Sequence, residues 1–468
     1  MFKSIFTNSF GILFSRILGF LRDMLQASIL GANIYTDIFI VAFKLPNLFR
    51  RIFAEGAFTQ SFLPSFSHSR QKSVFAVSIF LRFLIFLTVF ALFVTLFDNL
   101  FAKLIAWGFD DETIRKAAPL VAINFYYLIL IFIVTFLGSL LQYKNHFATT
   151  AFATALLNIA LISALLIARD LPKEVIVWYL SYAVIIGGIL QVAVHLIAVK
   201  KRHLDRLLVG GFKGLKSRQE RIREDKKRFS SNFFASVLGS STAQISAFLD
   251  GWLASFLAAG SISYLYYANR IFQFPLALFA IATSVAIFPK VTRYLKNDDQ
   301  DKAHEMLTKS FWFLAALLAA ATLTGIILSQ NIVRLLYERG AFVHEDTQNT
   351  ALVLSMYLIG LIPFGLAKIF SLWLYATHQQ KRAAKLSGIS LGVNILLSLA
   401  LIKPMGAAGL ALASSLSGIV LFALTIHAFG KAKFFAIIAH KYALYLIAAL
   451  GVLTLLLFQL KDLLRAYL

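Results

Sequence analysis

The sequence contains no cysteine among its 468 residues. Structural disulfides and cysteine-based zinc or redox sites are therefore excluded, and cysteine usage does not decide the compartment. Charged residues are scarce, at 14% of the chain, whereas about 25% is usual in a soluble protein. Strict alternation of apolar and polar residues is missing as well, which argues against a membrane-spanning β-barrel.

Long apolar runs recur along the whole chain, which is 59% hydrophobic with a mean hydropathy of +0.77. Each run is close to the ~20 residues that a membrane-spanning helix needs. We therefore expect an all-α polytopic membrane protein with thirteen spans, at about 4–30, 36–62, 74–98, 114–141, 147–168, 175–199, 230–258, 262–289, 307–330, 348–376, 384–402, 406–430 and 441–460. The N-terminal run lacks a small-residue cleavage site and is read as a retained first helix.

Basic residues outnumber acidic ones by 45 to 22, a net charge of +23. The basic loops fall on one side of the membrane if the N-terminus is cytoplasmic, as the positive-inside rule requires. This arrangement predicts a multi-pass protein of the bacterial cytoplasmic (inner) membrane. It also explains the charge without nucleic-acid binding, which is not expected.

The longest polar segment, residues 200–228, holds twelve Lys and Arg against four Asp and Glu. It is interpreted as a cytoplasmic linker lying on anionic lipid headgroups, with docking of a partner as the alternative. The linker separates an N-terminal six-helix lobe, 1–199, from a C-terminal six-helix lobe, 229–432. Residues 433–468 would add one further transmembrane helix, or at most two.

An internal repeat supports this division. "DMLQASILGA" from Asp23 resembles "DGWLASFLAAG" from Asp250, and "FKLPNLF" from Phe43 resembles "FQFPLAL" from Phe272. Six is an even number of spans, so both lobes would enter the membrane in the same direction. Such a parallel repeat is typical of transporters that rock two lobes around a central site. Pro46, Pro275 and Pro363 are candidates for kinks in the helices around it.

Charges inside the apolar segments are the candidate site. They are Arg16, Arg22, Asp23, Asp37, Lys44, Arg50, Arg51 and Glu55 in the first two spans, with Asp250 and Arg270 in the seventh and eighth. Intramembrane charges usually face a protein interior or a wet cavity. The excess of arginine predicts a central cationic cavity for a phosphorylated anion. Two alternatives remain open: Arg50 and Arg51 snorkel to the interface, or all the charges are paired as structural bridges.

Three segments resemble the bacterial lipid II flippases, the MurJ or MviN family, within a superfamily that includes drug exporters. They are "SRILGFLRD" (15–23), "TDIFIVAFKLPNLFRRIFAEGAFTQSFLP" (36–64) and "YYANRIFQFP" (266–275). The resemblance implies a transporter, not an enzyme, that moves lipid-linked peptidoglycan precursor from the cytoplasmic to the periplasmic leaflet for cell wall biogenesis and cell shape. It also implies inward-open and outward-open states that alternate.

The resemblance also implies which residues serve the substrate. Six match positions that are tied to function in the family: Arg16, Arg22, Asp37, Lys44, Arg51 and Arg270. Asp23, Arg50 and Glu55 lie in the same motifs. Asp250 matches a sodium ligand of some members, yet "YATHQQK" at 375–381 offers no acid to help it. No cofactor is expected, and a coupling cation, sodium or proton, stays undecided.

Other functions remain as alternatives. Composition does not distinguish a lipid II flippase from a flippase for another polyprenyl diphosphate oligosaccharide. A drug or cation antiporter would favour acids and aromatics over arginine in its cavity. The nine histidines are scattered and no nucleophile elbow or phosphate-binding loop is present, so an enzyme acting on the same lipid is less favoured. The sequence gives no indication of the oligomeric state.

Overall fold

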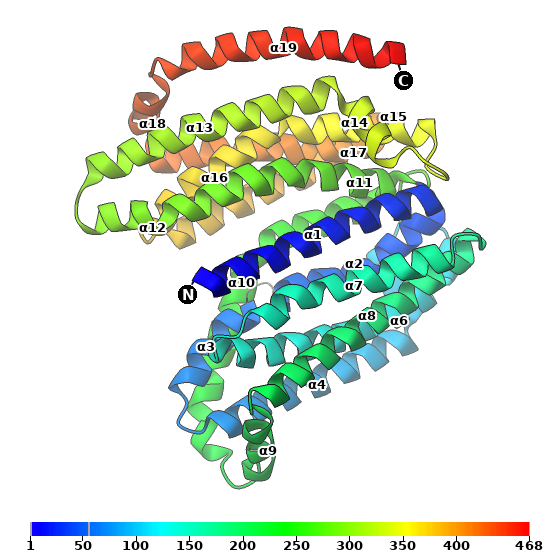
Figure 1. The fold of residues 1–468 in the computed structure, drawn as a ribbon, viewed down its shortest axis with the longest axis vertical. Coiled ribbons are helices and arrows are strands. Elements are labelled where there is room, and N and C mark those ends of the chain that lie inside the picture. Colours follow the sequence, from blue (N-terminus) through cyan, green and yellow to red (C-terminus); the bar gives the residue numbers. More distant parts are fainter. Residues whose placement is uncertain (1, 55–56, 468) are drawn as a thin grey trace. The chain divides into compact units, whose positions relative to one another are not determined.

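The computed structural model describes residues 2–54 and 57–467. Side chains are described except at 2–9, 12, 51–54, 235, 238–244, 247 and 465–467. The chain forms two compact units, Met1–Phe248 and Leu249–Leu468. Each unit consists of helices and turns throughout its described residues, which confirms the predicted all-α class (Figure 1).

The first unit contains the helices from α1 to the beginning of α10. These are α1 (Phe2–Leu30), α2 (Ile34–Ala54), α3 (Ala57–His68), α4 (Lys72–Leu96), α5 (Asp98–Ile105), α6 (Asp111–Tyr143), α7 (Ala148–Ile167), α8 (Lys173–Lys201), α9 (Asp205–Gly214), a short 3₁₀ turn (Glu220–Ile222) and α10 (Arg223–Ala254). The division between the units falls inside α10. The predicted linker is therefore partly helical, as α9 and the start of α10.

The core of the first unit is built around α6, which packs against α2, α4 and α8, while α7 packs against both α1 and α8. Glycine permits a close approach of α7 and α8: a Cβ on Gly187 of α8 would press on the backbone of Leu157 in α7. Phenylalanine side chains fill the core of this unit where α10 begins. Phe229 of α10 packs against Phe58, Phe62 and other aromatic rings, so the start of α10 is anchored in this unit.

The second unit continues from the end of α10. Its elements are α11 (Ser261–Pro275), a π-helical stretch (Leu276–Ile281), α12 (Ala282–Lys296), α13 (Gln300–Ile327), α14 (Ser329–Tyr337), α15 (His344–Ile359), α16 (Leu361–Ala376), α17 (Gln380–Phe429), α18 (Lys431–Ile438) and α19 (Tyr442–Tyr467). α15 packs against α11 and α17, and α16 packs against α13 and α17. α19 lies against α13 and is largely exposed.

Three interruptions shape the long helical segments of this unit. Pro275 ends α11 and the π-helical stretch follows it directly, because proline removes a backbone donor from the α-helical ladder. The predicted span at 348–376 is broken at Gly360, and Pro363 lies in the first turn of α16, where proline is tolerated. α17 reverses at Gly406, whose φ of 55° favours glycine, so it supplies both spans expected at 384–402 and 406–430.

The internal repeat extends further than the sequence motifs. In each unit a long helix is followed by a short one and then by another long segment: α4, α5 and α6 in the first, α13, α14 and α15 in the second. The short helices begin 231 residues apart, at Asp98 and Ser329, close to the spacing of the sequence motifs. The predicted parallel repeat therefore describes the order of elements inside each unit.

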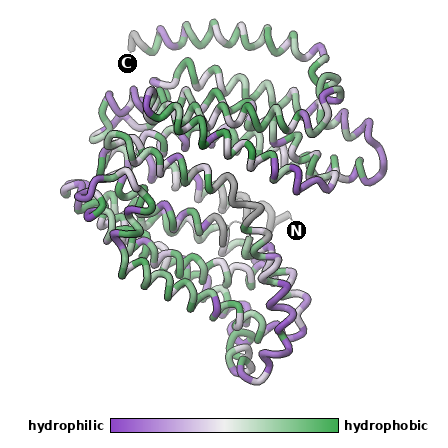
Figure 2. The backbone as a smooth tube through the Cα atoms, turned by 180° about the vertical axis from the view of Figure 1, so that it is seen from behind, coloured by the Kyte–Doolittle hydropathy of each residue, from purple (hydrophilic) through white to green (hydrophobic). Residues whose placement is uncertain are grey.

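Nine helical segments within the described residues are long and apolar enough to cross a membrane. Hydrophobic residues follow the middles of the helices, and hydrophilic residues gather at their ends and in the turns (Figure 2). α1, α2 and α10 are not among these nine, and each of them includes side chains outside the described part of the chain. They are also the helices that carry most of the candidate site.

Candidate functional site

Arg22 lies near the C-terminal end of α1 and is 8% exposed. Its Nε and Nη2 both donate to Oδ1 of the neighbouring Asp23, at 3.2 and 2.6 Å. Asp23 is 1% exposed, so the two form a buried ion pair. The structure thus brings one of the predicted carboxylates directly against one of the predicted arginines.

Asn158 of α7 completes the setting of Arg22. Its Oδ1 accepts a hydrogen bond from Nη1 of Arg22 at 3.1 Å, and its Nδ2 donates to the carbonyl of Ser15 at 3.1 Å. Gly19 lies against the Asn158 side chain, so α1 and α7 approach closely here. The amide thus fixes the guanidinium and satisfies a backbone carbonyl of α1 at the same time. Asn158 was not among the predicted site residues, and its only signal in the sequence is an amide inside an apolar span.

Asp37 lies in the first turn of α2 and is 1% exposed. The chain turns between α1 and α2 at Gly31, which has a φ of 76°. Oδ1 of Asn33 then accepts hydrogen bonds from the backbone N–H groups of Tyr35 and Thr36, an N-cap of α2. The carboxylate is thus buried at a rigid corner, and a negative group at a helix N-terminus is favoured by the helix dipole.

Lys44 and Arg50 lie further along α2 and are half-buried. Nζ of Lys44 donates to the carbonyl of Phe248 at 2.9 Å and lies 5.1 Å from the centre of the Phe248 ring. Arg50 donates from Nε and Nη2 to Oδ1 of Asn47, one turn earlier, at 3.1 Å each. Lys44 therefore ties α2 to α10, whereas Arg50 is held within its own helix.

The remaining candidates of the first repeat are placed differently. Arg16 is exposed on α1, two turns before the buried Arg22. The two are not on one stripe of the helix, as their six-residue spacing predicted. Arg51 belongs to α2, but its side chain lies outside the described part of the chain, as does Glu55 altogether.

Arg270 of α11 is half-buried and held by Tyr266, one turn earlier. Nη2 donates to the Tyr266 hydroxyl at 3.0 Å, and the guanidinium lies 5.1 Å from the centre of the same ring. Asn269 beside it accepts a hydrogen bond from Gln273 at 2.6 Å. Arg270 thus has an aromatic neighbour, which orients the guanidinium without neutralising its charge.

Asp250 is half-buried near the end of α10, and its Oδ2 accepts a hydrogen bond from the Ser414 hydroxyl of α17 at 3.1 Å. No group of three or more His, Cys, Asp and Glu residues with metal-binding geometry occurs among the residues that the structure describes. Asp250 and Ser414 would supply two oxygen ligands to a hard cation, and backbone carbonyls would have to supply others.

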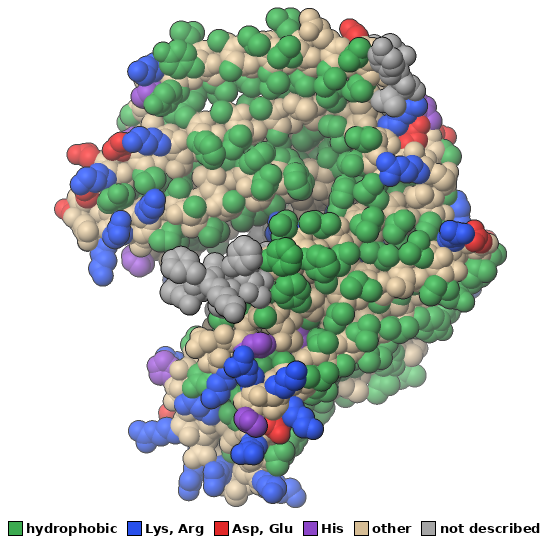
Figure 3. Space-filling model, viewed as in Figure 1, with side chains coloured by type: hydrophobic (Ala, Val, Ile, Leu, Met, Phe, Trp, Pro, Cys, Tyr) green, Lys and Arg blue, Asp and Glu red, His purple; other side chains and the backbone are tan. Residues whose placement is uncertain are grey.

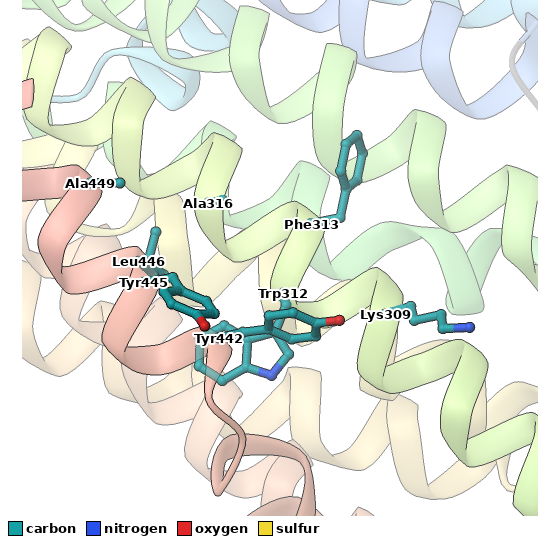
Figure 4. Close-up of a pocket in the computed structure, with 8 residues that line it drawn as sticks. All are labelled: Lys309, Trp312, Phe313, Ala316, Tyr442, Tyr445, Leu446 and Ala449. Atoms are coloured by element: carbon teal, nitrogen blue, oxygen red, sulfur yellow. The ribbon is translucent and has the colours of Figure 1, made fainter.

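An apolar pocket of about 400 Å³ lies between α13 and α19. Lys309, Trp312 and Phe313 project from α13, and Tyr442, Tyr445 and Leu446 line the side of α19 (Figure 4). The indole Nε1 of Trp312 donates to the carbonyl of Ile437 at 3.0 Å, which fixes the chain just before α19. The single C-terminal helix expected after the second lobe therefore borders a groove.

Lys368 was not among the predicted site residues. It is exposed on α16, in the apolar sequence "GLAKIF", so it is a cation inside a membrane-spanning segment. Such residues usually mark functional positions. The signal was available in the sequence as one lysine in an otherwise uncharged run.

These features define a class: an all-α membrane transporter with two units of repeated element order and buried charges on α1 and α2. The family model of the lipid II flippase MurJ matches residues 26–466. The chain therefore belongs to the lipid II flippase MurJ family, which confirms the resemblance found in the sequence. Proteins of this family are transporters rather than enzymes.

Individual relatives agree. The chain is 53% identical over 422 residues to a probable lipid II flippase MurJ of Helicobacter pylori, covering 88% of this chain and 92% of the relative. It is 31% identical over 473 residues to the corresponding protein of Buchnera aphidicola subsp. Baizongia pistaciae, covering 98% and 90%.

Two solved structures share the fold. The inward closed conformation of the lipid II flippase MurJ has a TM-score of 0.77, with 24% identity and coverage of 98% of this chain and 99% of that one. An inward-facing multidrug resistance transporter of the MATE family has a TM-score of 0.68 at 12% identity, with coverage of 91% and 96%. The second likeness shows a shared fold.

Proposed function

We propose that the chain moves lipid II from the cytoplasmic to the periplasmic leaflet of the bacterial inner membrane, and so serves peptidoglycan synthesis. The observation that carries the proposal is the family match over residues 26–466. The 53% identity to a relative named as a probable lipid II flippase supports the same substrate. The lipid carries a diphosphate, two sugars and a short peptide, none of which crosses hydrocarbon unaided.

The arginines are the proposed binding groups for the diphosphate. Arg16, Arg22 and Arg51 of the first unit and Arg270 of the second would bind it while the hydrocarbon tail stays in lipid. Guanidinium suits this task because it offers paired donors in a plane and stays protonated. Arg22 would exchange Asp23 for the phosphate oxygens, so the Arg22–Asp23 pair is the resting state of the site.

The transport cycle is proposed to be alternating access. Binding of the anionic head offsets the repulsion among the cations and lets the units close on the cytoplasmic side, and opening on the other side releases the head. The membrane potential is negative inside, and each negative charge moved fully outward gains ~2.3 kcal/mol per 100 mV. With a diphosphate as cargo, the potential is a sufficient driving force without a coupling cation.

Complementation tests this function. A strain depleted of its own lipid II flippase should grow when it expresses the chain, and should not accumulate lipid II in the inner leaflet. Arg22→Glu and Arg270→Glu should abolish rescue at normal membrane levels of the protein. Arg169→Glu is the matched control, because Arg169 is an exposed arginine of the turn between α7 and α8. Rescue by both charge-reversed variants would refute the arginine sites, and failure of the unaltered chain would refute the function.

A further inference from the structure

A cationic cavity lies within the first unit, on α4 and the start of α10. It measures about 660 Å³ and is lined by Arg82, Gln219, Glu220, Arg223, Lys226, Lys227, Ser230, Ser231 and Phe234. Four of these side chains are cations and one is a carboxylate. Lys and Arg side chains gather at the end of the unit where α9 lies (Figure 3). The cavity is thus strongly positive.

Lys226 distinguishes this cavity from a merely charged surface. It is 8% exposed, and no hydrogen bond or ion pair to it occurs among the residues that the structure describes. Burial lowers the pKa of Lys226, the positive charge of Arg82 lowers it further, and the negative charge of Glu220 raises it. One carboxylate compensates the four cations of the lining only in part, so a buried ammonium group without a direct ion pair favours the binding of an anion.

The walls of the cavity are held in place by packing. Three residues after Lys226, Phe229 is 1% exposed and packs among the aromatic rings of the first unit. α9 packs against α4, and Nη1 of Arg218 donates to Oε1 of Gln71 just before α4 at 3.1 Å. The cations are therefore presented on fixed helices.

The lining also continues into an apolar stripe. Ile85, Phe86 and Val89 follow Arg82 at spacings of three, four and seven residues, so they share its face of α4. All three are more than 60% exposed, and Phe234 on the α10 side is 65% exposed. A cationic cavity at the head of an exposed apolar stripe suits a ligand that has an anionic head and a hydrocarbon tail.

We propose that this cavity binds the headgroup of an anionic phospholipid of the cytoplasmic leaflet. Arg82, Arg223 and Lys226 contact the phosphate, Ser230 and Ser231 donate hydrogen bonds to the headgroup, and an acyl chain lies along the stripe of α4. The site fixes the basic linker and the start of α10 to the membrane surface. It requires the predicted orientation, in which the basic linker is cytoplasmic.

The test is a lipid titration of the purified full-length chain in a neutral detergent, followed by thermal unfolding. Phosphatidylglycerol should raise the melting temperature in a saturable manner, because a ligand of the folded state stabilises it. Phosphatidylcholine and inorganic phosphate are the probes for a charge-independent effect and for a free-anion site. An equal shift with either of them would overturn the proposal.

Two double variants distinguish lipid binding in this cavity from a general effect of positive charge on the protein. Arg82→Gln with Lys226→Gln should raise the phosphatidylglycerol concentration that gives half of the melting-temperature shift on the order of 25-fold. The expected loss is about fivefold for each basic residue removed near a membrane surface. Lys213→Gln with Lys216→Gln removes the same charge from exposed positions that do not line the cavity, and should leave the titration unchanged. Equal losses in both variants would overturn the site.

Lys226→Met provides a second, independent measurement. Since the variant removes a buried cation that lacks a direct ion pair, it should raise the melting temperature in the absence of lipid while it weakens the response to phosphatidylglycerol. A lower melting temperature together with an unchanged lipid response would show that Lys226 serves the fold alone, and would overturn the proposal.

Discussion

Arg22 donates two hydrogen bonds to one oxygen of Asp23, the next residue along the same helix, and a third to Asn158 of α7. Both charges of the pair are buried. A buried pair contributes little net stability when it is intact, but removal of one partner leaves a charge without compensation. The pair therefore couples the stability of the α1–α7 contact to the proposed site.

Arg22→Gln should destabilise the chain by about 3–5 kcal/mol, because the Asp23 carboxylate is left buried and unpaired. Arg22→Gln with Asp23→Asn should recover most of that stability, since no buried charge remains. Translocation of lipid II should be lost in both. Thermal unfolding and a leaflet-specific lipid II assay measure the two effects, and recovery of transport in the double variant would show that Arg22 has only a structural role.

Arg270→Lys should reduce transport by about tenfold or more, because lysine lacks the planar set of donors that binds a diphosphate. Tyr266→Phe is the control: it keeps the ring under the cation and removes one hydrogen bond, worth about 0.5–1.5 kcal/mol. Its effect on transport should be clearly smaller. Equal effects of the two substitutions would mean that Tyr266 acts through its hydroxyl and that Arg270 is merely its partner.

Gly211 and Gly210 of α9 provide a matched pair. A Cβ on Gly211 would meet the carbonyl oxygen of Ser73 and the side chain of Val77 in α4, whereas a Cβ on Gly210 meets nothing within 4 Å. Gly211→Ala should therefore cost about 1–3 kcal/mol through overpacking. Gly210→Ala should stabilise α9 by roughly 0.5–1 kcal/mol. Thermal unfolding distinguishes them, and the same sign for both would contradict the close packing of α9 on α4.

Asp110 is the N-cap of α6, and its charge should make the stability of the fold depend on pH. It lies outside the membrane-spanning segments. The backbone N–H of Thr113 donates to its Oδ1 at 2.7 Å, which lowers the pKa of Asp110 from 3.8. The stability that this charge provides is complete above pH 3.8 and is lost as the pH falls through the lowered pKa. Asp110→Asn keeps a capping oxygen and should flatten this part of the acid unfolding curve. An unchanged curve would refute the assignment.

Sodium replacement tests the proposed driving force. In vesicles with an imposed potential, exchange of sodium for choline should leave lipid II translocation unchanged, and Asp250→Asn should keep its dependence on the potential. The reason is that Oδ2 of Asp250 accepts a hydrogen bond from Ser414, and that Asp250 belongs to no group of three or more possible metal-binding side chains within the described part of the chain. A collapse of transport without sodium would establish cation coupling and restore Asp250 as a ligand.

The sequence predicted the class and the family because apolar length and the motifs at 15–23, 36–64 and 266–275 are local signals. It did not predict the break at Gly360 or the π-helical stretch after Pro275, since both depend on how neighbouring helices satisfy the backbone. The candidate charges were visible as costly residues in apolar runs. Their partners were not: Asn158 lies 136 residues from Arg22, and only packing brings them together.

The stretch Leu276–Ile281 has a consequence for how this region varies among relatives. A π-turn accommodates one extra residue locally, and the α-helices on either side keep their faces. A helical wheel drawn without a break through residues 261–296 misplaces every position after 281 by one residue, or about 100°. An insertion or deletion within this turn should therefore leave the side chain of Arg270 on the same face of α11. The same change in α11 before Arg270 would rotate that side chain to another face of the helix.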